Sequence, residues 1–150
     1  MINVVRSTVV DAPIARVWDV LRDFNGHDKW HPAVRESRID LRQPSDKVGC
    51  VRRFRLADGS ELTEQLLALS DVEHSFRYCL LETPIPLLNY VADVSLRKIT
   101  DGERTFWKWS SSFNVPKGQE KRLTDLVANG IYVAGFAAVK EQLAGTTRGR

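Results

Sequence analysis

The sequence is poor in the residues that form metal centres and disulfide frameworks. Its two cysteines, Cys50 and Cys79, lie in no CxxC or Cys/His spacing. Buried free thiols are therefore the simplest interpretation, and we predict no metal site and no cofactor. No stretch approaches the roughly 20 apolar residues of a membrane-spanning helix, and residues 1–3 lead into a strand pattern without a charged and apolar leader. These absences predict a cytoplasmic protein without a membrane span.

The chain also lacks repeats, linkers and a large excess of one charge. Its 150 residues carry 22 basic and 19 acidic side chains, a net charge of +3, and the basic cluster at residues 52–55 is followed by acidic residues at positions 58, 61 and 64. We therefore expect no nucleic-acid partner. The length suits one domain, which we place at residues 1–145. The small, polar and basic residues 146–150 are expected to form a flexible tail.

The first pattern along the chain is a strand near residues 2–10 followed by a short amphipathic helix. Asp11 is placed to cap this helix, and Pro13 lies in its first turn, where a missing N–H costs nothing. The apolar face of the helix consists of Ile14, Val17, Trp18 and Leu21. The Asn-Gly pair at residues 25–26 ends the helix, and a Trp-His-Pro corner at residues 30–32 precedes the second extended segment.

The middle of the chain alternates apolar and polar residues between turn signals, which predicts an antiparallel meander. The strands are expected near residues 34–42, 50–57, 60–70, 74–83, 88–100 and 104–114. A long helix should follow from about residue 119 to 144, with its apolar stripe on the concave face of the sheet. This stripe consists of Leu123, Val127, Ile131, Ala134 and Ala138. Gly130 and Gly135 within the helix favour close packing or leave room for a ligand.

One carboxylate falls on the apolar side of its strand. Glu64 shares parity with Leu62, Leu66 and Ala68, so we predict that it points inward and needs a partner or water. A salt bridge to Arg52 is one interpretation, and a polar anchor inside an apolar pocket is the other. The same parity requires a three-residue turn with a left-handed Gly59, so that Leu56 and Leu62 share a face.

Aromatic residues gather on the inward parity of the later strands. They are Phe76, Tyr78, Tyr90, Trp107, Trp109 and Phe113. Each one alone is an ordinary core residue, whereas together on a bent sheet around one helix they are typical of the walls of a cavity.

Several stretches carry a resemblance to a known family: VVDAPIARVWDVLRD followed by KWHP, VGCVRRFRLADGSELTEQLLALSD, and LLNYVADVSL ahead of a long C-terminal helix. They resemble the START/Bet v 1-like (SRPBCC) superfamily, and more narrowly its bacterial polyketide cyclase/dehydrase-like branch, which is related to the plant abscisic-acid receptors. The resemblance covers nearly the whole chain. It implies an α+β helix-grip fold, in which a seven-stranded antiparallel sheet wraps a long C-terminal helix and two short helices follow the first strand.

The resemblance also implies roles for individual residues. By motif, His31 falls about where the receptors carry a pocket lysine, Glu64 matches their pocket glutamate, and Tyr90 matches the tyrosine of their Asn-Tyr pair. Leu87 lies where the receptors have a latch loop, and the hairpin at residues 56–60 replaces their longer gate. The receptor gate's Leu-Pro pair and the His-Arg latch are absent, and Trp109 and Gly135 replace a glutamate and an asparagine. Abscisic acid is therefore not implied.

Two functions remain open from the sequence. The first is a non-catalytic carrier or sensor of a small hydrophobic molecule of lipid, polyketide, isoprenoid or aromatic type. The alternative is a cyclase or dehydratase in which Glu64 or His31 moves a proton. The predicted ligand-binding residues are His31, Arg52, Phe54, Leu56, Glu64, Tyr78, Leu87, Tyr90, Trp107, Trp109, Val127, Ile131 and Gly135. His27 and His74 are expected on the surface, and a homodimer is compatible with the sequence, which specifies no interface.

Overall fold

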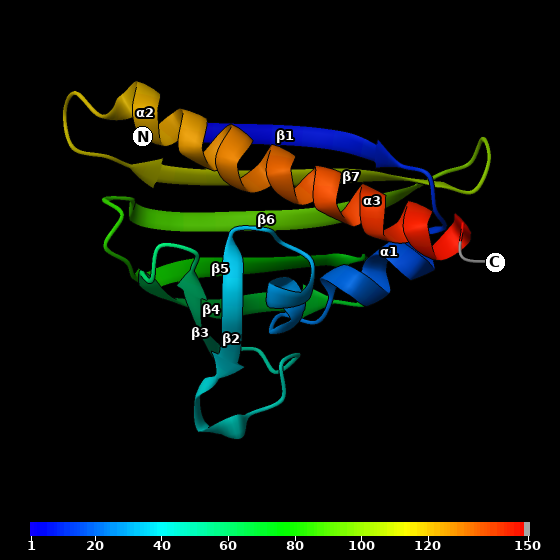
Figure 1. Ribbon diagram of the computed structural model, residues 1–150, viewed down its shortest axis with the longest axis horizontal. Coiled ribbons are helices and arrows are strands. Elements are labelled where there is room, and N and C mark those ends of the chain that lie inside the picture. Colours follow the sequence, from blue (N-terminus) through cyan, green and yellow to red (C-terminus); the bar gives the residue numbers. More distant parts are fainter. Residues whose placement is uncertain (149–150) are drawn as a thin grey trace.

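The protein is built on a single antiparallel sheet of seven strands, in the order β1-β7-β6-β5-β4-β3-β2 (Figure 1). The computed structural model describes residues 1–148, with side chains through residue 144. The strands are β1 (Ile2–Val10), β2 (Val34–Ile39), β3 (Val51–Leu56), β4 (Glu61–Ser70), β5 (Ser75–Glu82), β6 (Leu88–Ile99) and β7 (Arg104–Asn114). The meander predicted from the sequence is confirmed.

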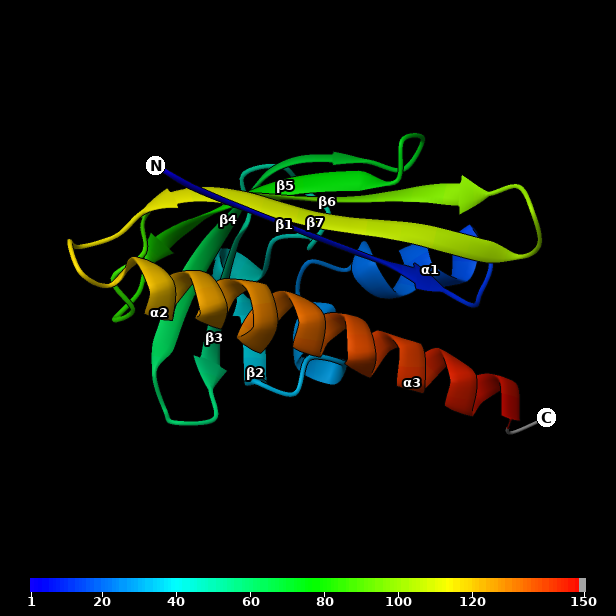
Figure 2. The same cartoon turned by 90° about the horizontal axis from the view of Figure 1, so that it is seen from above.

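The helices lie on one side of the sheet. They are α1 (Ile14–Leu21), the 3-10 helices η1 (Gly26–Lys29) and η2 (Asp40–Arg42), and a continuous C-terminal helix made of α2 (Glu120–Asp125), η3 (Leu126–Val133) and α3 (Ala134–Arg148). In Figure 2 the long helix runs along one face of the sheet, with α1 on that same face, while β2 and β3 curl toward the helix. The predicted helix-grip fold, with two short helices after the first strand, is confirmed.

The hairpin between β3 and β4 has the predicted turn. The Leu56 N–H donates to the Ser60 carbonyl at 2.9 Å, which leaves a three-residue loop, and Gly59 adopts a positive φ of 90°. Phe54 therefore pairs with Leu62 in the register. The inward faces of the two strands coincide because of this turn, and it brings Glu64 opposite Arg52.

Two local expectations are corrected at the ends of elements. Asp11 does not cap α1, because Pro13 is the N-cap residue and no side chain caps this end. The second strand ends at Ile39 rather than residue 42, since Leu41 and Arg42 have positive φ values of 59° and 53°. A left-handed backbone cannot continue a strand.

A β-bulge corrects the predicted inner face of β4. Leu62, Glu64 and Leu66 are buried as expected, but Ala68 is exposed. The register with β5 shifts between Leu66 and Ala68, and Leu69 takes the inward place opposite Phe76. The extra residue of a bulge reverses which side chains point inward.

A π-helical segment corrects the predicted stripe of the C-terminal helix. Leu123 and Val127 are buried as expected, whereas Ile131, Ala134 and Ala138 are only partly buried. The buried residues beyond Val127 are Ala128, Tyr132, Phe136, Val139 and Leu143. Hydrogen bonds from residue i+5 to residue i make the turns of η3 wider than α-helical turns. The inner face is therefore displaced by about one residue along the rest of the helix.

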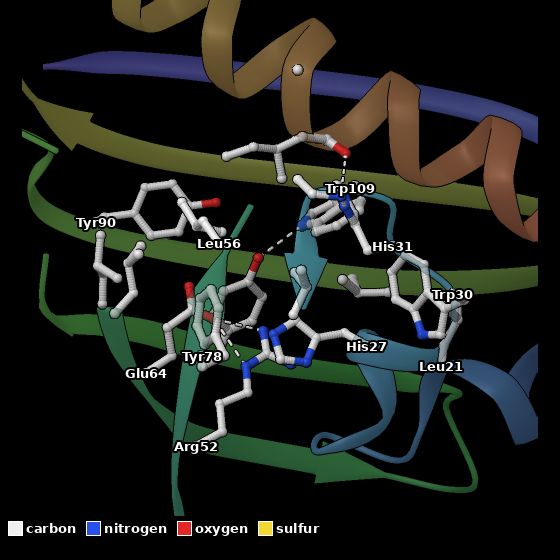
Figure 3. Close-up of a pocket in the computed structure, with 18 of the residues that line it drawn as sticks. Leu21, His27, Trp30, His31, Arg52, Leu56, Glu64, Tyr78, Tyr90 and Trp109 are labelled. Carbon is white, nitrogen blue, oxygen red and sulfur yellow. Dashed lines mark hydrogen bonds and ion pairs between the residues drawn. The ribbon is translucent and has the colours of Figure 1, made fainter. Parts of the chain in front are cut away.

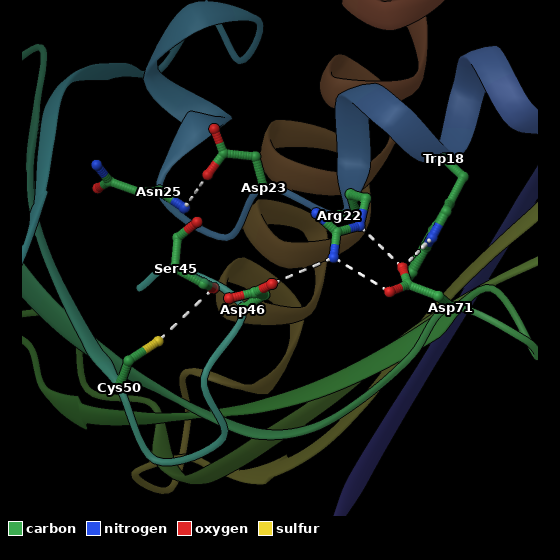
Figure 4. A network of polar contacts seen from close by, with 8 residues as sticks. All are labelled: Trp18, Arg22, Asp23, Asn25, Ser45, Asp46, Cys50 and Asp71. Carbon is green, nitrogen blue, oxygen red and sulfur yellow. Dashed lines mark hydrogen bonds and ion pairs between the residues drawn. The ribbon is translucent and has the colours of Figure 1, made fainter. Parts of the chain in front are cut away.

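A polar network fastens α1 to the turn between β4 and β5 (Figure 4). The Trp18 indole N–H donates to Asp71 at 2.7 Å, and Arg22 binds Asp71 at 2.8 Å and Asp46 at 3.4 Å. The network lies on the rim of the molecule, and it holds the end of α1 from which the chain turns into η1.

The C-terminal end and the cysteines complete the description. Helix α3 includes residues 146–148 of the predicted tail, and residues 149 and 150 lie outside the described part of the chain. Cys50 is buried and Cys79 half-buried, both as free thiols. Among the residues that the structure describes, no helix has both the length and the apolar character needed to cross a membrane.

Gly135 should be required for helix packing, and Gly130 should not. A Cβ at residue 135 would lie 3.0 Å from the Trp109 ring and 3.2 Å from the rings of His31 and Trp30. We expect Gly135→Ala to lower the free energy of unfolding by about 1–3 kcal/mol. Gly130→Ala is the matched control, because its Cβ meets only the flexible end of Leu126, and it should stabilise by about 0.5–1 kcal/mol. Urea denaturation measures both, and equal stabilisation by the two variants would contradict this account.

Candidate functional site

A cavity of about 150 Å³ lies between the concave face of the sheet, the corner after α1 and the π-helical segment. Predominantly apolar side chains from most elements of the fold form its walls. They are Leu21, Trp30, Ala33, Val34, Phe54, Leu56, Leu62, Phe76, Tyr78, Leu80, Ile85, Leu87, Tyr90, Val94, Trp107, Trp109, Leu126, Gly130 and Ile131. Asp23, His27, His31, Arg52 and Glu64 are the charged or titratable residues of the lining.

Most of the predicted ligand-binding residues line this cavity, and two do not. Val127 is fully buried in the core and is not part of the cavity wall. Gly135 is packed against Trp109 and His31, so its missing side chain allows close approach of the helix and leaves no room for a ligand. The π-helical segment contributes Leu126, Gly130 and Ile131 to the cavity wall.

The charged pair of the cavity joins two neighbouring strands. Arg52 of β3 pairs directly with Glu64 of β4 in the register. The Arg52 Nε and Nη2 atoms both donate to Glu64 Oε1, at 2.9 and 2.6 Å. Both side chains are buried and both line the cavity. The salt bridge interpretation is therefore confirmed, and the ion pair also forms part of the cavity lining.

Aromatic rings and a backbone carbonyl hold the Arg52 side chain in place. Its Nη1 donates to the Phe24 carbonyl at 2.6 Å, and the guanidinium carbon lies 3.9 Å from the centre of the Phe24 ring and 5.1 Å from that of Tyr78. Cation–π contacts of this kind gain strength when they are shielded from water. The position of the positive charge is thus determined before any ligand binds.

Glu64 keeps one oxygen for the cavity. Both bonds from Arg52 go to Oε1, and Oε2 has no hydrogen-bond partner among residues 1–148. Figure 3 shows this second oxygen turned away from Arg52 and toward the space beside Leu56 and Tyr90. Burial raises the pKa of the Glu64 carboxyl, and the adjacent Arg52 opposes that rise. The two short bonds from Arg52 are those of an ionised carboxylate.

His31 uses both of its ring nitrogens within the protein. Nδ1 accepts the Ala33 N–H at 3.1 Å, so Nε2 carries the proton and donates it to the Ile131 carbonyl at 2.8 Å. Burial lowers the pKa of His31. The neutral ring therefore connects the corner at residues 30–32 to η3, and this arrangement favours a structural role over proton transfer.

His27 was expected on the surface, but it lines the cavity. Its side chain is 7% exposed, and neither ring nitrogen has a hydrogen-bond partner. The ring stands edge-on to Phe54 with 4.6 Å between centroids. Burial, with Arg52 nearby, lowers the pKa of His27 well below its usual value. His27 lies in η1 (Gly26–Lys29), which is too short to show a periodicity from which its burial could be predicted.

The opposite wall is a fixed aromatic surface. The Trp109 indole N–H donates to the Tyr78 hydroxyl at 3.1 Å, and the Tyr90 hydroxyl is hydrogen-bonded to that of Tyr132. Trp109 also stacks on the Tyr132 ring with 4.3 Å between centroids. Burial raises the pKa values of all three tyrosines, so their phenol groups are neutral at physiological pH.

Comparison with known proteins places this cavity in a family context. Residues 1–144 match the family described as polyketide cyclase / dehydrase and lipid transport. The chain belongs to this family. No curated protein matches the sequence.

Solved structures with the same fold come from bacteria and plants. A protein of Thermobifida fusca is 26% identical, with a TM-score of 0.83 over 95% of this chain and 93% of that one. The Zhui aromatase/cyclase of Streptomyces sp. R1128 is 22% identical, with a TM-score of 0.77 over 94% and 92% of the two chains. Norcoclaurine synthase of Thalictrum flavum is 15% identical, with a TM-score of 0.74 over 96% and 87%. At such identities the last two are similar in fold alone.

Metal ligation is not a feature of the described cavity. Within residues 1–148, no group of three or more His, Cys, Asp or Glu side chains converges in a geometry that would hold a metal ion. The polar groups in the cavity lining include those of Glu64, Arg52, His27 and Asp23, and the unpartnered indole N–H groups of Trp30 and Trp107.

The buried ion pair should show strong coupling. Arg52→Met and Glu64→Leu should each lower the free energy of unfolding by about 3–5 kcal/mol, because each leaves one uncompensated charge in an apolar site. The double variant should recover most of this loss. Urea denaturation of the four proteins gives the coupling directly. Strictly additive single effects would show that the pair is solvated and contributes little.

Stability should fall on mild acidification. Folding lowers the pKa values of His27 and His31 below 6.5, so the unfolded chain binds more protons as the pH drops through this value. The free energy of unfolding is therefore highest above about pH 7 and decreases toward pH 5. Urea denaturation across this range measures the slope. His27→Leu should flatten it, and an unchanged slope in this variant would assign the effect elsewhere.

Proposed function

We propose that the protein binds a small, largely apolar molecule of about one ring in the cavity between the sheet and η3, as a carrier or sensor. The observation that supports this most directly is a cavity of about 150 Å³ with predominantly apolar walls and one polar end. Apolar cavities of about this size accept benzene. Larger lipids or polyketides would require the walls to move apart.

The apolar area that a ligand buries against the cavity walls determines most of its binding free energy. A bound aromatic ring buries on the order of 150–200 Å², which at about 25 cal/mol per Å² corresponds to roughly 4–5 kcal/mol. Dissociation constants between about 0.1 and 1 mM follow for the simplest ligands. A tighter natural ligand needs additional polar contacts, and the Arg52–Glu64 end of the cavity is where they would form.

The polar groups favour binding over catalysis. Both nitrogens of His31 are occupied, and Arg52 opposes the rise in the pKa of Glu64 that a general acid would need. The second candidate is a polyketide cyclase/dehydratase-type enzyme. It is favoured by the free Oε2 of Glu64 and by similarity to the Zhui aromatase/cyclase, and in such an enzyme Glu64 rather than His31 would exchange protons with the substrate.

Filling the cavity should abolish binding. Val94→Phe adds a ring from the inner face of β6, where Val94 lines the cavity. Val91→Phe is the matched control, because it places the same ring on the outer face of the same strand. We expect single-ring apolar compounds at millimolar concentration to raise the melting temperature of the wild type and of Val91→Phe, but not of Val94→Phe.

Two outcomes would contradict the proposal. One is the absence of any ligand-dependent shift in the wild type across a panel of single-ring, isoprenoid and polyketide compounds. The other is an equal shift in Val94→Phe, which would place binding outside the cavity. Native mass spectrometry of freshly purified protein would complement the panel by giving the mass of a molecule retained from the host.

A further inference from the structure

We infer that the ligand carries a neutral hydroxyl group on its ring-sized apolar body, as a phenol, an enol or an alcohol does, and that Glu64 and His27 recognise this hydroxyl. The inference rests on the proposed function, since it names the chemistry of the molecule bound in the same cavity. Three features of the cavity lead to it: a free carboxylate oxygen, an unpartnered imidazole and a balanced charge.

The free oxygen of Glu64 requires a donor. Arg52 directs both of its hydrogen bonds at Oε1, and no described residue donates to Oε2. Buried polar atoms without partners are rare, and an ionised one is especially costly. Because Oε2 faces the cavity (Figure 3), a bound molecule is in a position to donate a hydrogen bond to it.

His27 supplies the second half of the site. Its two ring nitrogens are buried without partners, and its ring contacts Phe54, which also lies 5.6 Å from the Arg52 guanidinium. With its lowered pKa the imidazole is neutral, and it offers one N–H donor and one acceptor. A hydroxyl group donates one hydrogen bond and accepts others, so its chemistry matches both the unpartnered oxygen of Glu64 and the N–H of the neutral His27 ring.

Charge compensation within the Arg52–Glu64 pair disfavours ionic ligands at this end of the cavity. Arg52 is neutralised by Glu64 at 2.6 Å. A carboxylate ligand would bring a second negative charge beside Oε2, and an ammonium group would lie beside the buried guanidinium. Either would be desolvated without a compensating partner. A neutral donor is the chemistry that this pair accepts.

Three compounds of one ring test the inference. Phenol, toluene and benzoate have similar bodies and present a hydroxyl, a methyl and a carboxylate, respectively. Indole N–H resonances can follow their binding, because Trp30, Trp107 and Trp109 line the cavity, while Trp18 is bonded to Asp71 outside it and serves as an internal control. Phenol should bind about tenfold more tightly than toluene, as expected for a hydrogen bond to a charged acceptor, and benzoate should not bind.

A variant that removes the negative charge of Glu64 should invert this selectivity. Glu64→Gln retains the shape of the side chain but leaves Arg52 without its counterion. Benzoate should then bind, and the preference for phenol over toluene should disappear. Glu61→Gln makes the same chemical change on the exposed face of the same strand and should keep the wild-type order. His27→Phe should weaken phenol binding and leave toluene binding unchanged.

The results with the wild-type protein distinguish failure of the hydroxyl site from failure of the proposed binding function. If toluene binds as tightly as phenol, the hydroxyl site is overturned while the apolar cavity stands. If benzoate binds most tightly, the site recognises anions and the inference is wrong. If none of the three compounds shifts the cavity tryptophans, the proposed function fails as well. The wild-type series decides these outcomes even when a variant does not fold.

Discussion

The ion pair between Arg52 and Glu64 is the interaction on which the interior of this protein depends. Two charges in an apolar space are tolerated only when they neutralise each other and when other groups satisfy their remaining hydrogen bonds. Here the strand register brings the two residues together, and the Phe24 carbonyl and ring complete the surroundings of the guanidinium. Within the pair, Glu64 Oε2 has no partner among the described residues, and it is exposed to the polar end of the cavity.

The two layers of the fold meet around this pair in different ways. On the sheet side, hydrogen-bonded strands hold Arg52, Glu64 and Tyr78 in a fixed relation. On the helix side, η3 contacts the corner at residues 30–32 through the bond from His31 to the Ile131 carbonyl. The cavity is therefore enclosed by a rigid sheet and by a helix that one imidazole fastens to a loop.

Much of this arrangement could be predicted from the sequence, because alternation along strands is a strong signal. The antiparallel meander, the left-handed Gly59 and the inward direction of Glu64 followed from alternation and turn signals, whereas the sheet wrapped around the C-terminal helix followed from the family resemblance. The failures share a physical cause, which is a single residue added to a regular element. The bulge at residues 66–68 exposed Ala68, and η3 moved the buried stripe from Ile131 to Tyr132. Neither the bulge nor the extra residue of η3 can be detected from the periodicity of apolar residues in the sequence. His27 was missed because η1 is too short to show a periodicity.

Other predictions stay where the sequence left them. The cytoplasmic location, the absence of a nucleic-acid partner and the compatibility with a homodimer rest on composition and pattern alone. Family membership limits the choice of function but leaves the ligand open, because proteins that share a fold can carry different functions.

The π-helical segment Leu126–Val133 determines which side chains of the later C-terminal helix face the sheet. The segment holds one residue more than an α-helix of the same length. The residues that face the sheet after it are therefore shifted by one position relative to those before it. Deleting one residue there would allow a regular α-helix that keeps Tyr132, Phe136 and Val139 on the inner face. An α-helical segment of unchanged length would instead turn every later side chain by about 100° and bring Ile131, Ala134 and Ala138 inward. The C-terminal helix is thus continuous, and its π-helical segment is the part that lines the cavity.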